Sequence, residues 1–99
     1  MIETVTRKRI EILTDKAFVP RLTAEIDQAG IMGWTIVPVS SGDGEWREES
    51  VMGTDKVFVL SIASQERAER LAEALAPLST TLGFLLLMWD VEVIRGERF

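Results

Sequence analysis

The chain has 99 residues, a formal net charge of −5 at pH 7 and neither cysteine nor histidine. These absences exclude thiol catalysis, a Ser-His-Asp triad, disulfides and the usual zinc ligands. The acidic balance disfavours nucleic-acid binding, which depends on attraction to the phosphate backbone, so no nucleic-acid partner is expected. The length predicts a single domain over residues 1–99. A hydrophobic fraction of 46% is high for so small a chain and predicts self-association.

Three elements are expected before residue 40. Charged and apolar residues alternate from Arg7 to Leu13, which predicts a strand with one wetter face. A helix is expected from Pro20 to about Gln28, because proline suits a first turn and apolar residues recur at helical spacing. Gly30 is placed to end that helix in the left-handed conformation. Residues 34–39 are rich in β-branched and aromatic side chains and predict a second strand.

A strand and a helix are expected directly after residue 55. Residues 56–63 form a second apolar, β-branched run and predict the third strand. Ser64 is a natural N-cap for a helix from Gln65 to about Ala76. Pro77 is expected to stop it.

The end of the chain completes a repeated pattern. Residues 78–83 are expected as a short connection to an apolar strand at residues 84–89, with a short extended segment around residues 91–95. The order strand-helix-strand then occurs twice, which predicts an α+β, ferredoxin-like βαββαβ fold: a four-stranded antiparallel sheet with two helices on one face. The other face, with Phe58, Ile62 and residues 85–87, would be apolar and uncovered in a monomer. We expect a compact trimer to bury it.

A long connection separates the second and third strands. It runs over about sixteen residues, 40–55, and holds three of the seven glycines. A hairpin needs only two to five linking residues, so this length predicts a functional loop on a rigid sheet. At its base, Ser40, Ser41, Gly42 and Gly44 offer amides and hydroxyls that suit a phosphate or bicarbonate anion, although such a stretch taken alone is more often a plain turn.

Four segments resemble the PII signal-transduction proteins. The match runs without gaps from Lys8-Arg9-Ile10-Glu11 through Gly30-Ile31-Met32-Gly33-Trp34-Thr35-Ile36. It resumes at Lys56-Val57 and again at Asp90-Val91-Glu92-Val93-Ile94-Arg95, one residue short of the family's pattern. Together the segments cover roughly three quarters of the chain. Each motif is short, and their order and spacing carry the resemblance.

The resemblance implies a regulatory sensor and not an enzyme. It implies a homotrimer that binds an adenine nucleotide in the clefts between subunits, with the long loop as a shortened T-loop at about 40–55. The chain has no tyrosine, so the uridylylated tyrosine of many members cannot exist here. The family's phosphate loop is reduced to residues 77–83 and has lost its lysine. These departures favour the carboxysome-associated PII-like branch, which binds ADP or AMP in a bicarbonate-sensitive way.

Candidate nucleotide ligands follow residue by residue from the resemblance. Thr35 corresponds to a turn threonine that approaches adenine, and Leu13 and Ile62 to apolar residues of the base pocket. Each of the three also suits an ordinary strand or core role. Arg95 matches a phosphate-binding arginine directly, whereas Arg98 matches one only if the register shifts. The nucleotide-binding set is completed by the loop base, Ser40, Ser41, Gly42 and Gly44.

Two further groups of residues are candidates for other ligands. Lys56 at the foot of the third strand, with Ser41 and Gly42, is expected to hold bicarbonate or phosphate. The loop tip is expected to face an unknown protein target through Trp46, Arg47, Glu48 and Glu49. For Trp46, packing back onto its own trimer is an equal alternative.

Two other function classes stay open at this point. A small dimeric α+β barrel enzyme is one, although the missing histidine and the lack of a catalytic constellation count against it. A structural adaptor module without a ligand is the other. The longest apolar run is too short to span a bilayer and no signal-peptide pattern is present. The expected location is therefore the cytoplasm, with carboxysome association implied by the resemblance.

Overall fold

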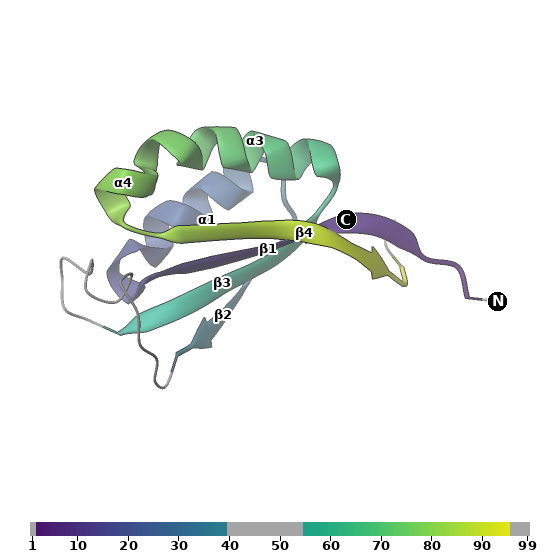
Figure 1. Ribbon diagram of the computed structural model, residues 1–99, viewed down its shortest axis with the longest axis horizontal. Coiled ribbons are helices and arrows are strands. Elements are labelled where there is room, and N and C mark those ends of the chain that lie inside the picture. Colours follow the sequence, from purple (N-terminus) through teal and green to yellow (C-terminus); the bar gives the residue numbers. More distant parts are fainter. Residues whose placement is uncertain (1, 40–54, 96–99) are drawn as a thin grey trace.

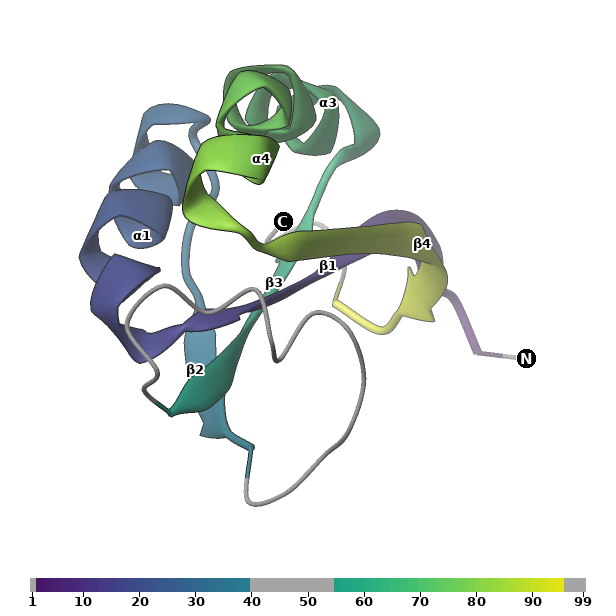
Figure 2. The same ribbon diagram turned by 60° about the vertical axis from the view of Figure 1, so that its left-hand side comes forward.

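The computed structural model describes residues 2–39 and 55–95 (Figure 1). Its elements are β1 (Val5–Asp15), η1 (Lys16–Phe18), α1 (Val19–Gln28), β2 (Thr35–Pro38), β3 (Lys56–Ala63), α3 (Gln65–Leu75), η2 (Ala76–Leu78), α4 (Ser79–Leu82) and β4 (Leu85–Val93). The strands form one sheet in the order β2-β3-β1-β4, with every neighbouring pair antiparallel. Figure 2 shows α1 and α3 together on one face of this sheet. The predicted ferredoxin-like fold is confirmed.

Strand β1 lies inside the sheet and divides it into two chemically different faces. Ile10 and Ile12 are fully buried and form the core with Leu22 and Ile26 of α1 and Leu71 of α3. Since side chains alternate along a strand, the odd-numbered positions of β1 point to the face without helices. We call this second face the open face. Its residues on the four strands are Arg7, Arg9, Glu11 and Leu13; Thr35 and Val37; Phe58, Leu60 and Ile62; and Leu85, Leu87, Trp89 and Val91.

The helices begin and end where local chemistry places them. Ser64 caps α3, its hydroxyl accepting a hydrogen bond of 3.3 Å from the backbone N–H of Arg67. Gly30 follows α1 with φ of 82°, the left-handed conformation that glycine adopts without a side-chain clash. Both assignments agree with the prediction. Each helix turns its apolar stripe to the sheet, with Leu22 and Ile26 on α1 and Leu71 on α3 all fully buried.

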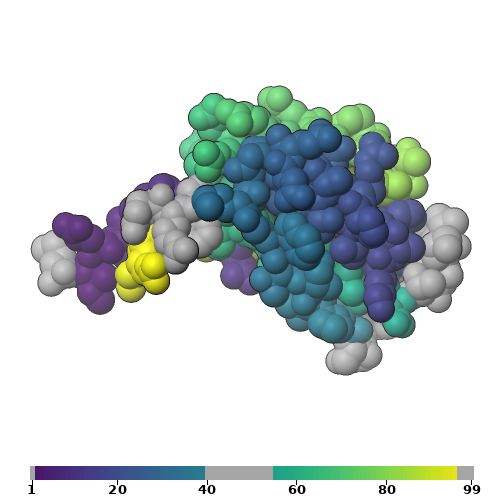
Figure 3. Space-filling view, turned by 180° about the vertical axis from the view of Figure 1, so that it is seen from behind, coloured from purple at the N-terminus to yellow at the C-terminus, as the bar shows by residue number. Residues whose placement is uncertain are grey.

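The C-terminal third differs from the prediction in two respects. The α-helix ends at Leu75, yet the expected connection at 78–83 is itself helical, as η2 and α4, and ends at Gly83 with φ of 64°. The separate extended segment expected around 91–95 is wrong. Strand β4 runs on to Val93, because β1 starts at Val5 and offers partners for the whole length. Figures 1 and 3 show the start of β1 and the end of β4 projecting together.

The ends of β2 and β3 come together where the long loop leaves the sheet. The Val39 N–H donates to the Lys56 carbonyl at 3.1 Å, and the Lys16 N–H donates to the Asp55 carbonyl at 2.9 Å. The loop is thus attached at a strand end that is fixed by backbone hydrogen bonds. Residues 40–54 lie outside the described part of the chain.

A buried ion pair lies at this same strand end. Lys56 Nζ is 3.0 Å from Asp15 Oδ1, across the last register pair of β1 and β3. The two residues are only 7% and 1% exposed. Asp15 Oδ1 accepts no hydrogen bond of good geometry from the described residues, so the attraction between the two charges is chiefly what holds the pair. Either charge alone would be costly to bury.

Removing one partner of this pair should therefore be strongly destabilising. We expect Asp15→Ala to lower the free energy of unfolding by about 3–5 kcal/mol, because it leaves an uncompensated buried ammonium. The double variant Asp15→Ala/Lys56→Met should recover most of that loss. Urea denaturation of the wild type, Asp15→Ala, Lys56→Met and the double variant gives the coupling energy.

The matched control is Lys8→Met, which breaks the 2.7 Å pair between Lys8 and Asp90. These side chains are 24% and 65% exposed, so the loss should stay below about 1 kcal/mol. A double variant no more stable than Asp15→Ala would contradict the assignment.

Candidate functional site

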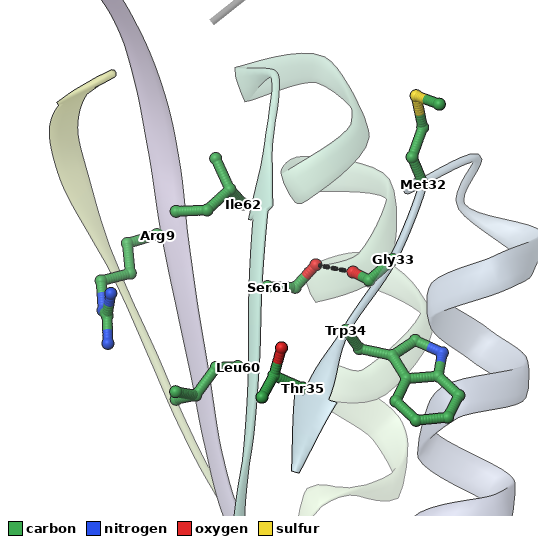
Figure 4. Close-up of a pocket in the computed structure, with 8 residues that line it drawn as sticks. All are labelled: Arg9, Met32, Gly33, Trp34, Thr35, Leu60, Ser61 and Ile62. Atoms are coloured by element: carbon green, nitrogen blue, oxygen red, sulfur yellow. Dashed lines mark hydrogen bonds between the residues drawn. The ribbon is translucent and has the colours of Figure 1, made fainter. Parts of the chain in front are cut away.

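A groove of about 630 Å³ lies along the β2–β3 edge of the sheet (Figure 4). Its size falls within the range of small-molecule sites. The residues that line it come from β1, from β3 and from the segment that leads into β2: Arg9, Met32, Gly33, Trp34, Thr35, Leu60, Ser61 and Ile62. The groove is therefore made by the rigid sheet on one side and the end of the α1–β2 connection on the other.

Apolar side chains form the sheet side of the groove. Figure 4 shows Leu60 and Ile62 pointing to the same side of β3, the side on which Arg9 lies. Thr35 is the register partner of Leu60, so these two residues are neighbours in the groove. Met32 and Trp34, 75% and 44% exposed, add apolar surface from the connection. A flat, largely apolar ligand with a few polar atoms suits such walls.

One buried hydrogen bond fixes the other side of the groove. The Ser61 hydroxyl donates to the Gly33 carbonyl at 2.5 Å, and Ser61 is 6% exposed. Residues 31–34 have no regular secondary structure of their own, so this bond to β3 sets where the connection runs. This hydrogen bond therefore fixes the position of the start of β2. Thr35, the first residue of β2, is thereby held at a set distance from Ile62. Ser61 is thus a positioning residue.

Arg9 brings the charge to the groove. Its Nε donates to Glu11 Oε2 at 3.0 Å, and its guanidinium carbon lies 5.8 Å from the centre of the Trp89 ring. Both contacts restrict the side chain. None of the other lining residues carries a titratable side chain. The groove thus combines apolar walls with a single, oriented cation.

The structure brings two of the expected nucleotide ligands together and separates the others. Thr35 and Ile62 both line the groove. Leu13 is four positions further along β1 than Arg9, the partner of Ile62, which puts it roughly 13 Å away. Lys56 lies beyond Leu13 and is occupied by its pair with Asp15. Arg95 is exposed, with φ of 67°, at the opposite end of the sheet.

The remaining expected ligands cannot be placed. They are Ser40, Ser41, Gly42, Gly44 and Arg98 for the nucleotide or anion, and Trp46, Arg47, Glu48 and Glu49 for the protein target. All of them lie outside the described residues.

Arg9, Leu60 and Ser61 are groove residues that sequence reasoning missed. The alternation along β1 and β3 puts Arg9 and Leu60 on the open face, and this signal was available. That Arg9 and Leu60 lie close to Thr35 depends on the order of the strands in the sheet, and the alternation of side chains along a strand does not predict that order. The Ser61 bond joins residues 28 positions apart and carries no local signal.

Neither a cluster of metal-binding side chains nor a membrane-spanning helix occurs among the described residues. Over residues 2–39 and 55–95 no group of three or more acidic side chains is placed to hold a metal ion. Within the same ranges no helix is both long and apolar enough to cross a bilayer.

Solved structures match the whole chain. CPII from Thiomonas intermedia K12, solved bound to ADP and bicarbonate, superposes with a TM-score of 0.85 at 26% identity, over 100% of this chain and 99% of that one. A proposed PII-like signalling protein from Thermus thermophilus gives 0.81 at 25% identity, over 99% of each chain. The ATP complex of Bacillus subtilis GlnK, at 0.62 and 13% identity over 87% and 82%, supports the fold alone.

Sequence comparison gives the family. No curated protein sequence matches the chain. The family of the nitrogen regulatory protein P-II, however, matches residues 7–98, nearly the whole length. Members of this family are generally non-catalytic regulators. The chain belongs to the nitrogen regulatory protein P-II family, and its architecture is similar to that of PII-like relatives such as CPII.

Proposed function

We propose that the protein is a non-catalytic sensor that binds ADP or AMP in the clefts between subunits, together with bicarbonate, and reports on inorganic carbon metabolism. The observation that carries the proposal is the groove, which presents Thr35 and Ile62 on a fold that matches a complex with ADP and bicarbonate along its entire length. A second structure of the same relative holds ADP, AMP and acetate. Small carboxylate-type anions therefore accompany adenine nucleotides in that relative.

The scatter of the expected ligands over one chain supports a site shared between copies. Leu13 and Arg95 lie toward opposite ends of the sheet, and neither lines the groove with Thr35 and Ile62. A single nucleotide could touch all four only if a neighbouring copy supplies some of them. The groove is open in the monomer and would be closed by that neighbour.

The open face supports assembly as a trimer. Leu85, Leu87 and Trp89 of β4 are 37%, 42% and 41% exposed, and Phe58, Leu60 and Ile62 of β3 point to the same face on the far side of β1. An open face with two rows of apolar side chains, divided by Arg9 and Glu11 of β1, favours association with other copies. Packing three sheets around an axis buries it and generates three equivalent clefts.

The anion is assigned to the loop base. Lys56 lies at the strand end from which residues 40–54 depart, next to the backbone bond between Val39 and Lys56. An anion that binds there with the amides of Ser41 and Gly42 must compete with Asp15 for the ammonium. Bicarbonate would then change the balance of charge at the foot of the T-loop.

The output of the sensor is assigned to the loop tip. A loop whose two conformations bind the ligand with different affinities shifts its population when the ligand binds. Trp46, Arg47, Glu48 and Glu49 would present that state to a protein target. A cytoplasmic, carboxysome-associated location follows from the same proposal.

The chemistry of the groove speaks against catalysis. Arg9 is the titratable side chain that lines it, and a guanidinium stays protonated in proteins, so it is a poor general acid or base. Orientation and charge are what this groove supplies, which suits a ligand that is bound and released unchanged.

Calorimetry with ADP and AMP, each with and without bicarbonate, tests the proposal. We expect both nucleotides to bind with Kd well below about 1 mM, and bicarbonate to tighten at least one of them. Ile62→Ala removes apolar surface from the groove wall and should weaken ADP about tenfold. Ile2→Ala makes the same substitution at a residue 73% exposed and outside the groove, and should leave the affinity unchanged. Absence of nucleotide binding up to millimolar concentration would end the proposal.

The trimer is tested at the centre of the open face. Leu87→Lys puts a charge into the proposed interface but beside Glu11, its register partner, so the monomer should stay folded. We expect light scattering to show a shift from three copies to one, with helical circular dichroism retained. Ala74→Lys adds the same charge on the exposed side of α3 and should leave the trimer intact. If Leu87→Lys stays trimeric, the open face is not the interface.

A further inference from the structure

We propose that Arg9 binds a phosphate of the nucleotide and thereby sets the preference of the groove for nucleotides over uncharged nucleosides. The inference rests on the proposed nucleotide binding and adds a ligand at a position that neither the resemblance nor the comparisons assign. The inference follows from the position of Arg9 in the groove and from the terminal N–H donors of its guanidinium.

The position of Arg9 joins it to the expected base pocket. Arg9 and Ile62 are register partners on β1 and β3, so their Cα atoms lie roughly 5 Å apart. Figure 4 shows the Arg9 side chain on the side of β3 to which Ile62 and Leu60 point. A base packed against these two side chains and Thr35 has its ribose and phosphates within reach of the groove's single cation.

The contacts of Arg9 orient it without using up its donors. Glu11 receives the Nε–H at 3.0 Å, and the Trp89 ring lies 5.8 Å from the guanidinium carbon. Between described residues, this is the single hydrogen bond that the side chain makes, so the terminal Nη groups keep their N–H donors. The side chain is 38% exposed. A braced guanidinium with free terminal donors is suited to bidentate phosphate binding.

The alternative role for Arg9 is stacking of its guanidinium on the base. Its contacts with Glu11 and Trp89 argue against that role. Trp89 already lies against the guanidinium, and Glu11 holds its Nε edge. The exposed edge carries N–H donors, which a phosphate uses and the face of a base does not.

The test is calorimetry of ADP binding to the full chain over a series of salt concentrations. Arg9→Gln should weaken ADP about tenfold and flatten the salt dependence of binding, because a charge-assisted hydrogen bond and its Coulomb attraction are both lost. Lys8→Gln removes the same charge one residue away, on the opposite face of β1, where Lys8 pairs with Asp90. This control should bind ADP as the wild type does, with the same salt dependence.

Three outcomes overturn the inference. They are an unchanged ADP affinity in Arg9→Gln, an equal loss in Lys8→Gln, and a weaker affinity whose salt dependence is that of the wild type, which would mean that Arg9 only packs. If Arg9→Gln fails to fold, Arg9→Lys keeps the charge but loses the planar fork, and an affinity less than twofold below the wild type then counts against a bidentate contact. A wild type that binds no ADP overturns the proposed function itself, whereas each outcome above leaves that function standing.

Discussion

In an antiparallel sheet with helices on one face, the side chains of the other face are left uncovered. This constraint shapes the whole molecule. The helices α1 and α3 bury Ile10 and Ile12 completely. The odd-numbered side chains of the same strand, among them Arg9 and Leu13, therefore point to the open face. That face carries exposed apolar side chains, among them Leu87 and Trp89, which the proposed association with other copies would bury. The proposed ligand site between copies would lie along the same face.

The register of β1 determines which chemistry meets on the open face. One residue of slip would carry Arg9 and Glu11 into the core and Ile10 and Ile12 to the surface, which is prohibitively unfavourable. Because the register is fixed, Arg9 lies beside Ile62 on one neighbour and Trp89 on the other. The cation, the apolar wall and the aromatic ring are thus held together by backbone pairing, with no loop required.

Whether a feature of the fold or of the groove can be predicted from the sequence depends on how far apart in the chain the interacting residues lie. The caps at Ser64 and Gly30 are local, and the sequence predicts them. The extension of β4 to Val93 depends on partners in β1 that lie more than eighty residues earlier in the chain. The polar composition of the last ten residues therefore does not predict this extension. Thr35 and Ile62 were found through resemblance, whereas Ser61 acts through a carbonyl 28 positions away and was missed.

The ion pair between Asp15 and Lys56 links the sheet to the loop in the same way. Asp15 is the last residue of β1 and Lys56 the first of β3, and the backbone bonds of Val39 and Asp55 lie directly beside them. A buried ammonium without a counter-charge is costly. In the absence of an anion, Asp15 supplies the counter-charge to Lys56. An anion at the loop base would supply a second counter-charge and allow the Asp15 side chain to move away from Lys56. In the proposed mechanism the anion gains binding energy only as Lys56 gives up its contact with Asp15, so occupancy by the anion and rearrangement of this ion pair would be parts of one equilibrium.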